Sequence, residues 1–321
     1  MKAHWIVSTV LVAGLGATAN AQTSGGEVLA VFTKNQTNPF FQTFRLGAES
    51  AAKQLNAKVT HYIPTKPDSI PEQMSQIEDV IVKKPNAIIY IPVDYKAMVP
   101  GIQKMNAAKI PVINATDRSE SGEFVSFVGA SDYALALESS RILFKAMGGK
   151  GNVVALEGVK GTLTNTDRMR GFTDAVKQYP NIKVVASQPG NYQRLLALQV
   201  MENLMQSNPQ IDGVFAANDA MASGAIEALE GAKRKALVVG INGTKEGVDA
   251  VVAGKMLATA DYGGFMQGCL STMIAVRHLR KQPVPKEVIF PPVVIDKSNA
   301  AKYSAPAETM ACPAWADMPK G

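Results

Sequence analysis

AIIYI, residues 87–91, is an apolar run in which hydrophobic and polar side chains do not alternate. A strand of this kind is buried on both faces, which is typical of a parallel sheet covered by helices on both sides. The preceding residues 70–81 place apolar side chains at intervals of four, three and four residues, which predicts a helix with one buried face. The two patterns together indicate an α/β fold.

The same alternation of strand and helix patterns extends outward, from residue 27 to beyond residue 240. Strands are expected at residues 28–32, 58–63, 87–91, 110–113, 153–156, 183–186, 214–217 and 237–241, and helices near residues 39–55, 70–81, 99–105, 165–178, 192–207 and 219–231. Two successive series of this kind predict two doubly wound parallel-sheet lobes. Because no Gly/Ser-rich linker separates the two series, we expect a structured hinge between the lobes.

Composition and motifs exclude several classes of protein. With 33 Lys and Arg against 27 Asp and Glu, the formal net charge is only +6 and no basic cluster is present, so no nucleic-acid partner is expected. The three histidines and two cysteines form no zinc motif, and no phosphate-binding loop, dinucleotide-binding glycine motif or G-x-S-x-G elbow occurs. The sequence therefore favours a binding protein over an enzyme, with no cofactor and no metal.

The N-terminal residues have the features of a secretory signal peptide. Lys2 precedes an apolar run over residues 5–15, and the segment ends in Ala19-Asn20-Ala21, a pattern that signal peptidase recognises. A membrane anchor needs about 20 apolar residues, more than this run supplies. We expect cleavage after Ala21, export to the periplasm and a mature protein that is not embedded in the membrane.

Export bears on the two cysteines, because an oxidising compartment permits a disulfide between Cys269 and Cys312. The sequence leaves two alternatives open, a disulfide or two unpaired thiols with Cys269 buried on a helix.

Polar side chains gather at the turns that follow predicted strands, where open α/β sheets bind their ligands. They are Asn38, Asp117, Arg118, Arg168 and Asn218, and the aromatic residues Phe40 and Phe41 follow Asn38 at a helix start. Any one of these residues alone is more often a helix cap, an ion-pair member or a core side chain. As a set they suit a polyhydroxylated ligand, since carboxylates and guanidinium groups form paired hydrogen bonds and aromatic rings stack on sugar C–H faces.

Several segments of the chain resemble one protein family. They are NPFF (38–41), TDR (116–118), DRMRGF (167–172), FAAND (215–219), MASGA (221–225) and VGINGT (239–244). On these segments the chain resembles the periplasmic sugar-binding proteins of ABC importers, in the ribose- and allose-binding group, over about residues 27–297. The resemblance implies that Asn38, Asp117, Arg118, Arg168 and Asn218 bind ligand hydroxyls, that Phe40, Phe41 and Tyr192 stack on the ligand, and that Lys34 acts like the lysine of the allose binders.

Three departures from the family's pattern affect the expected ligand. Asn242 stands where the family usually has an aspartate, and Pro92 replaces a common asparagine. The usual glutamine of the family is absent, which leaves Asp261 or Tyr262 to fill its place. Such replacements in a buried site can leave polar groups without a hydrogen-bond partner, at a cost of about 1–3 kcal/mol each. We therefore do not expect this chain to share the ribose specificity found in the family. A different pentose, a hexose or an acyclic sugar alcohol fits the sequence equally well.

The resemblance also implies a domain organisation and a mechanism. The signal peptide (1–21) precedes an N-terminal lobe (22–131 plus 263–291) and a C-terminal lobe (132–262 plus 292–321), joined by a three-strand hinge as in type I periplasmic binding proteins. The lobes are expected to close on a sugar or polyol and to present a joined surface to the transmembrane subunits of an ABC permease, with the protein acting as a monomer.

Two other functions remain open alternatives. The same fold serves periplasmic sensors that bind a small polyhydroxylated signal. An exported sugar hydrolase or isomerase with Asp117 and Asp261 as acid and base is the less favoured alternative, because no catalytic motif is present.

Overall fold

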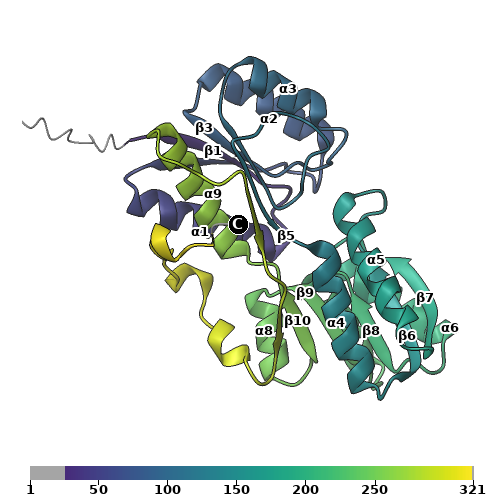
Figure 1. Ribbon diagram of the computed structural model, residues 1–321. Coiled ribbons are helices and arrows are strands. Elements are labelled where there is room, and N and C mark those ends of the chain that lie inside the picture. Colours follow the sequence, from purple (N-terminus) through teal and green to yellow (C-terminus); the bar gives the residue numbers. More distant parts are fainter. Residues whose placement is uncertain (1–25, 320–321) are drawn as a thin grey trace, which may run out of the picture.

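The computed structural model describes residues 26–319, and these residues form two α/β lobes, each built on a six-stranded sheet with helices on both faces (Figure 1). The predicted fold class, two doubly wound parallel-sheet lobes, is confirmed. The predicted signal peptide, residues 1–21, lies outside the described residues.

Lobe one contains the sheet of the N-terminal half. Its strands are β1 (Val28–Phe32), β2 (Lys58–Tyr62), β3 (Ala87–Tyr90), β4 (Val112–Ala115), β5 (Ser126–Ala130) and β11 (Glu287–Phe290), and its helices are α1 (Pro39–Gln54), α2 (Ile70–Lys83), α3 (Val99–Ala107) and α9 (Gly264–Leu279). The strand order is β11-β5-β4-β3-β1-β2, and all neighbouring strands are parallel. All four residues of β3 are fully buried, because helices cover both faces of this central strand.

Lobe two repeats this plan. Its strands are β6 (Lys150–Glu157), β7 (Asn181–Pro189), β8 (Gly213–Ala216), β9 (Leu237–Asn242), β10 (Ala258–Asp261) and β12 (Val293–Asp296), and its helices are α4 (Asp132–Ala146), α5 (Leu163–Lys177), α6 (Arg194–Ser207), α7 (Asp219–Gly231) and α8 (Lys245–Val252). The strand order is β12-β10-β9-β8-β6-β7, and only the edge strand β12 is antiparallel to its neighbour.

Asparagine caps start two helices where the sequence predicts them. The Asn38 side chain accepts a hydrogen bond from the backbone N–H of Phe40, and Pro39 occupies the first position of α1. Asn218 caps α7 in the same way by accepting from the N–H of Met221 at 2.9 Å. Both caps hold their helix N-termini at the carboxyl edge of a sheet.

The chain passes between the sheets three times, from β5 to α4, from β10 to α9 and from β11 to β12. These crossings lie close together in the centre of the molecule (Figure 1). Gly263 has a φ of 70° at the start of α9, a left-handed conformation that costs glycine little. The turn at the second crossing therefore depends on this residue.

After β12 the chain forms a C-terminal strap, residues 297–312, that contacts both lobes. The 3₁₀ turn η1 (Ala300–Tyr303) packs against α8 of lobe two, and η2 (Ala307–Thr309) packs against α1 of lobe one. This differs from the predicted lobe boundaries, which place all of residues 292–321 in lobe two. The pattern of prolines in this segment predicts an irregular path but carries no information about which lobe it contacts.

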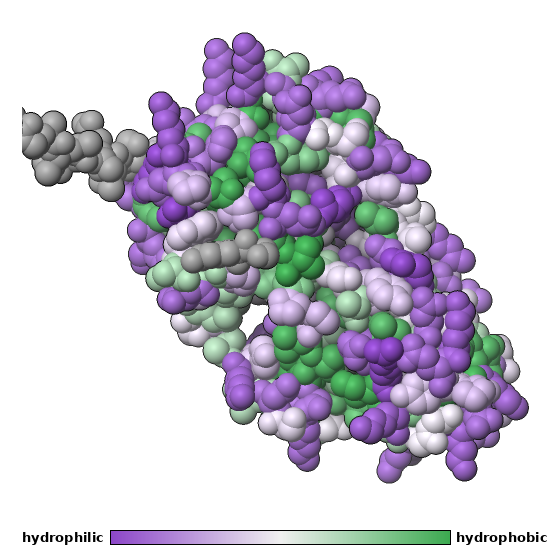
Figure 2. Space-filling view, viewed as in Figure 1, coloured by the Kyte–Doolittle hydropathy of each residue, from purple (hydrophilic) through white to green (hydrophobic). Residues whose placement is uncertain are grey.

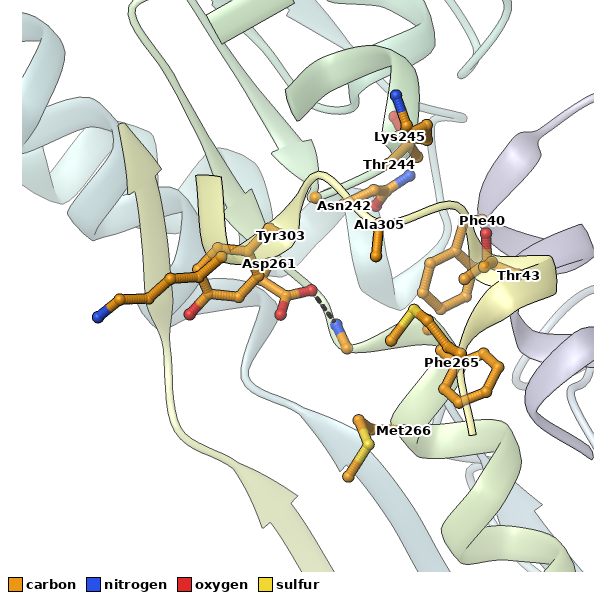
Figure 3. A pocket seen from close by; sticks show the side chains of 16 residues that line it. Phe40, Thr43, Asn242, Thr244, Lys245, Asp261, Phe265, Met266, Tyr303 and Ala305 are labelled. Atoms are coloured by element: carbon orange, nitrogen blue, oxygen red, sulfur yellow. Dashed lines mark hydrogen bonds between the residues drawn. The ribbon is translucent and has the colours of Figure 1, made fainter. Parts of the chain in front are cut away.

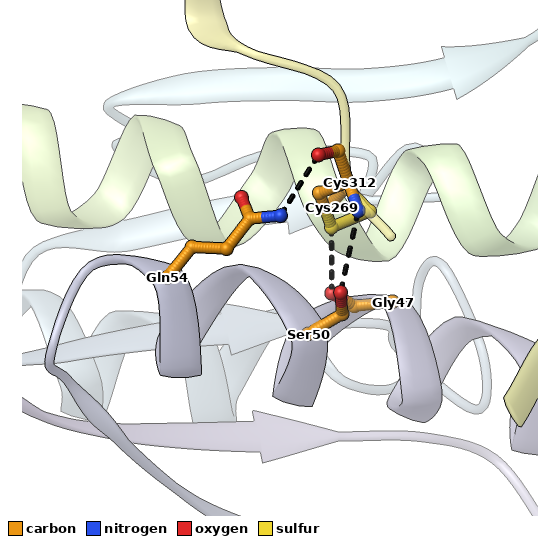
Figure 4. The surroundings of a disulfide bond; sticks show 5 residues. All are labelled: Gly47, Ser50, Gln54, Cys269 and Cys312. Carbon is orange, nitrogen blue, oxygen red and sulfur yellow. Dashed lines mark hydrogen bonds between the residues drawn. A yellow bond between two sulfur atoms is a disulfide. The ribbon is translucent and has the colours of Figure 1, made fainter. Parts of the chain in front are cut away.

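A disulfide fixes the end of the strap to lobe one (Figure 4). Cys312 is bonded to Cys269 of α9, with 5.7 Å between their Cα atoms. Gln54 of α1 donates to the carbonyl of Cys312 at 2.8 Å, and the N–H of Cys312 donates to Ser50 at 3.3 Å. Of the two alternatives that the sequence leaves open for the cysteines, the structure has the disulfide.

Two further features concern residues 26–319 as a whole. No helix in this range combines the length and hydropathy needed to cross a membrane. Hydrophilic side chains cover most of the face shown in Figure 2, and this face is hollowed between the two lobes.

Candidate ligand-binding site

A cavity lies between the lobes at the carboxyl ends of both sheets. It encloses about 400 Å³ when space open to solvent is included. It is lined by Lys34, Asn35, Asn38, Phe40, Phe41, Asp68, Thr116 and Asp117 of lobe one, by Thr164, Arg168, Tyr192 and Asn242 of lobe two, and by Tyr262 at the hinge. Nine of the twelve residues singled out from the sequence lie here.

Asp117, in the turn after β4, is the acidic group of the lobe-one wall. Its side chain is only 8% exposed, and its Oδ2 lies 3.1 Å from Nζ of Lys34. Its Oδ1 accepts a hydrogen bond from the hydroxyl of Thr164, which belongs to α5 of lobe two. The carboxylate therefore has one partner from each lobe.

Lys34 follows β1 and faces two carboxylates. Burial alone would lower the pKa of Lys34, but the nearby charges of Asp117 and Asp68 outweigh burial and raise it. Lys34 is therefore a charged donor throughout the physiological pH range. Burial raises the pKa of Asp68 despite the neighbouring lysine.

Arg168 of α5 provides the cationic group of the lobe-two wall. It is 2% exposed, its Nε donates to Oδ1 of Asp132 at 2.7 Å, and its Nη1 donates to the carbonyl of Ala217 at 2.5 Å. Its Nη1 also lies 3.4 Å from Oδ1 of Asn242. These contacts fix the plane of the guanidinium group against the cavity.

Asp132 is the counterion of Arg168 and also binds the hinge. Its Oδ2 accepts from the hydroxyl of Tyr262 at 2.8 Å. Burial raises the pKa of Asp132 to about 6, although the charge of Arg168 acts in the opposite direction. Burial alone would lower the pKa of Arg168, but the negative charge of Asp132 outweighs burial and raises this pKa.

Aromatic rings form the apolar part of the wall. The ring of Phe40 lies 5.4 Å from that of Phe41 and 5.1 Å from that of Tyr262, measured between centroids. The guanidinium of Arg168 lies 5.8 Å from the ring centre of Tyr192. A Cβ at Gly158 would stand 2.0 Å from that tyrosine ring, so glycine here leaves the space that Tyr192 fills.

Strained backbone gathers at this cavity. Thr116 and Tyr192 have φ angles of 62° and 60°, Asp68 has 55° and Asn242 has 137°. Residues other than glycine rarely adopt positive φ, at a cost of about 1–3 kcal/mol each, and such residues tend to cluster at functional sites. The strain supports a binding role for this cavity.

Three residues singled out from the sequence do not line the cavity. The side chain of Arg118 is half exposed, pairs with Glu287 and lies over the ring of Phe127 at 3.9 Å. Asn218 is fully buried, where it caps α7 and donates to the carbonyl of Tyr192 at 3.3 Å. Asn218 thus holds the backbone that presents Tyr192, while Arg118 turns away from the ligand space.

The third, Asp261, lines a neighbouring cavity (Figure 3). This cavity measures about 710 Å³ including open space and lies beneath the strap residues Tyr303 and Ala305. Phe40 and Asn242 line both cavities. Asp261 accepts from the N–H of Gly263 at 2.7 Å, and burial raises its pKa to about 6.

Sequence reasoning missed several site residues. They are Asn35, Asp68, Thr116 and Thr164, which line the cavity, and Asp132, which pairs with Arg168. Asp68 lies in the turn region between β2 and α2. The expectation that ligand-binding residues lie in the turns after strands therefore applies to Asp68 as well. Thr164 lies four residues before Arg168 and therefore shares its helix face. Asp132 carries no such signal, because it starts a helix at a crossing between the lobes.

The charges of the site are nearly balanced. Lys34 and Arg168 face the carboxylates of Asp68, Asp117 and Asp132, and each cation has a carboxylate partner. No surplus positive charge is left to attract an anionic ligand. Donors and acceptors fixed on both sides, with aromatic rings between them, suit an uncharged molecule with several hydroxyl groups.

Comparisons with known proteins agree with this geometry. A family model described as "Periplasmic binding protein domain" matches residues 29–283. The ribose import binding protein of Haemophilus influenzae is 30% identical over 90% of this chain and 97% of its own length. The D-apiose import binding protein of Paraburkholderia graminis is 30% identical over 89% of this chain and 92% of its own length. An ABC transporter periplasmic solute binding protein from Actinobacillus succinogenes, solved with bound D-allose, is 35% identical with a TM-score of 0.83, covering 86% of this chain and 100% of that chain.

Proposed function

This chain belongs to the periplasmic binding protein family, and from that premise we propose that it binds a neutral monosaccharide or sugar alcohol between its lobes and delivers it to the permease of an ABC importer. The protein is proposed to act in the periplasm as a monomer. Because contacts from both lobes exist together only when the lobes are closed, ligand binding stabilises the closed arrangement.

One observation carries the proposal. Asp117 and Lys34 of lobe one and Arg168 and Asn242 of lobe two line a single cavity, with the aromatic ring of Phe40 beside them. A carboxylate, an ammonium and a guanidinium group held in fixed positions can bind several hydroxyls of one small ligand.

The relatives support the same class of ligand. They are import proteins for ribose and D-apiose, and the solved relative holds D-allose. In this chain Asn242 provides an amide group at the cavity wall. The ring of Tyr262 packs beside that of Phe40, and its hydroxyl donates a hydrogen bond to Asp132. These residues support a sugar or polyol other than ribose as the ligand.

A ligand panel tests the proposal. Thermal unfolding of the purified protein is measured with D-ribose, D-allose, D-apiose, D-fructose, xylitol and myo-inositol, and each positive compound is then titrated by calorimetry. At least one compound should raise the melting temperature, because a ligand that binds only the folded state stabilises it. If no pentose, hexose or polyol shifts the transition, the proposal is wrong.

The same panel addresses the remaining alternatives. The family is a solute-binding one, and we propose that the bound sugar is released unchanged, which chromatography of the recovered ligand tests. A sensor role uses the same cavity, and neighbouring genes for a permease rather than a kinase favour transport.

The proposed signal peptide has its own test. Mass spectrometry of protein exported to the periplasm should find Gln22 as the first residue.

A further inference from the structure

Thr164 connects the two lobes directly across the ligand cavity. Its hydroxyl donates to Oδ1 of Asp117, so a side chain of lobe two contacts the acidic group of lobe one. Both residues are buried, at 9% and 7% exposure. Away from the hinge turns (residues 131–134 and 261–263) and the C-terminal strap, the described residues contain no other side-chain hydrogen bond between the lobes.

The position of Thr164 on α5 explains why its hydroxyl is available. Thr162 caps the helix by accepting from the N–H of Asn165 at 3.3 Å, so the helix does not require the Thr164 side chain. Thr164 precedes Arg168 by one helical turn and therefore faces the cavity beside it. The carboxylate that it meets has its other oxygen on Lys34.

Closing the lobes removes Asp117 from water, and a buried carboxylate oxygen without a donor is costly. Lys34 accompanies Asp117 in the open and the closed arrangement, because both belong to lobe one. Thr164 reaches Asp117 only when the lobes are together. Its hydrogen bond therefore stabilises closure whether or not a ligand is present.

We propose that Thr164 is a positioning residue that stabilises the closed lobes through Asp117 and so raises the affinity for every ligand of this site by the same factor. The inference rests on the proposed function, because closure matters only for a protein that closes on a ligand. A carboxylate offers about four lone-pair sites, so Asp117 can accept from Thr164 and from a ligand hydroxyl together.

Three variants test this proposal. Thr164→Val removes the hydroxyl at nearly constant volume, Thr164→Ser retains it, and Thr166→Val makes the same change at an exposed position two residues along the helix. Affinity for every compound that binds the wild-type protein is measured by calorimetry. The radius of gyration of each ligand-free protein is measured by small-angle X-ray scattering, and its melting temperature shows that it is folded.

We expect Thr164→Val to weaken binding of all positive compounds by one common factor, about ten- to a hundredfold, and to increase the radius of gyration without ligand. Thr164→Ser and Thr166→Val should behave like the wild type. The proposal is overturned if Thr164→Val leaves affinity unchanged, if it changes the order of preference among ligands, or if serine does not restore binding. If no compound binds the wild-type protein, the proposed function fails, while the scattering comparison still decides whether Thr164 stabilises closure.

Discussion

Arg168 combines two roles in one side chain, since it lines the cavity and neutralises the buried carboxylate of Asp132. Replacing it by alanine removes charge-assisted donors to the ligand and leaves a buried charge unpaired. We expect Arg168→Ala to weaken ligand affinity by about 30-fold or more, as measured by calorimetry with the best compound of the panel.

A matched control separates this effect from a general loss of charge. Arg170, two positions along α5, is exposed and pairs with Asp167 on the surface. Arg170→Ala should retain wild-type affinity, because exposed ion pairs contribute little. Equal affinities for the two alanine variants would remove Arg168 from the site.

Asp261 provides a prediction about pH. Its pKa of about 6 lies above the ordinary value of 3.8, so the folded protein holds this proton more tightly than the unfolded chain does. The protonated Asp261 side chain therefore stabilises the folded state below about pH 4, and this contribution to the free energy of unfolding is lost as the pH rises through about 6. Asp261→Asn retains an oxygen acceptor for the N–H of Gly263 without a charge.

We therefore expect Asp261→Asn to increase the free energy of unfolding by about 1–3 kcal/mol at pH 7 and to have little effect at pH 4. Urea unfolding at several pH values measures this difference. A gain of the same size at both pH values would show that the carboxyl does not titrate in this window.

Most residues of the site could be predicted from the sequence, but which of their side chains point into the cavity could not. Asp117 and Arg118 are adjacent and both suit a hydroxyl ligand, yet only Asp117 lines the cavity. Thr116, with its φ of 62°, sets the direction of this turn, and a left-handed threonine is not encoded in any local pattern. Asn218 was recognisable both as a cap and as a ligand residue, and its side chain makes the capping contacts.

At the scale of elements, the disulfide is the contact with the most direct consequence for stability. It joins residues 43 positions apart, and loop-entropy arguments assign such a bridge about 2–4 kcal/mol. A variant with serine at both Cys269 and Cys312 should lose about this much unfolding free energy in urea denaturation. Wild-type protein unfolded under reducing conditions should match the variant, and equal stability of oxidised and reduced wild type would contradict the prediction.

The central strands were predictable because burial on both faces leaves an apolar run that few other structures require. β1 begins and ends as expected, at residues 28 and 32, and α7 begins and ends at residues 219 and 231. The route of the strap was not predictable, since the pairing of Cys312 with α9 depends on the path of the chain rather than on local sequence. For the same reason, the sequence does not indicate the role of Asp132, whose partner Arg168 lies 36 positions away.

At the scale of the whole molecule, the strap adds a fourth connection between the lobes. Only Ser304, Ala305 and Pro306 separate the turn that packs on lobe two from the turn that packs on lobe one. A chain spans at most about 3.3–3.6 Å per residue, so this short link limits how far the lobes can separate along this flank.

Lengthening the strap should therefore widen the open state. Inserting about six Gly and Ser residues after Ser304 adds roughly 20 Å of reach while leaving the disulfide intact. We expect a larger radius of gyration without ligand, measured by small-angle X-ray scattering, and weaker ligand binding because the closed state is less populated.

An equal insertion after Gly148 provides the control. Gly148 lies between α4 and β6 within lobe two, with open space around it and no part in the strap. This variant should scatter like the wild type. Identical scattering of the strap variant and the control would show that the strap does not limit opening.

The division of the chain between the lobes also bears on the order of folding. Lobe two is almost entirely one continuous segment, residues 132–262, whereas lobe one needs α1 to pack on α9 and Gln54 to meet Cys312, 258 positions away. Bringing distant segments together is slow, because the entropy of closing long loops is lost before the contacts form. During refolding, backbone amides of lobe two should become protected from hydrogen exchange before those of lobe one.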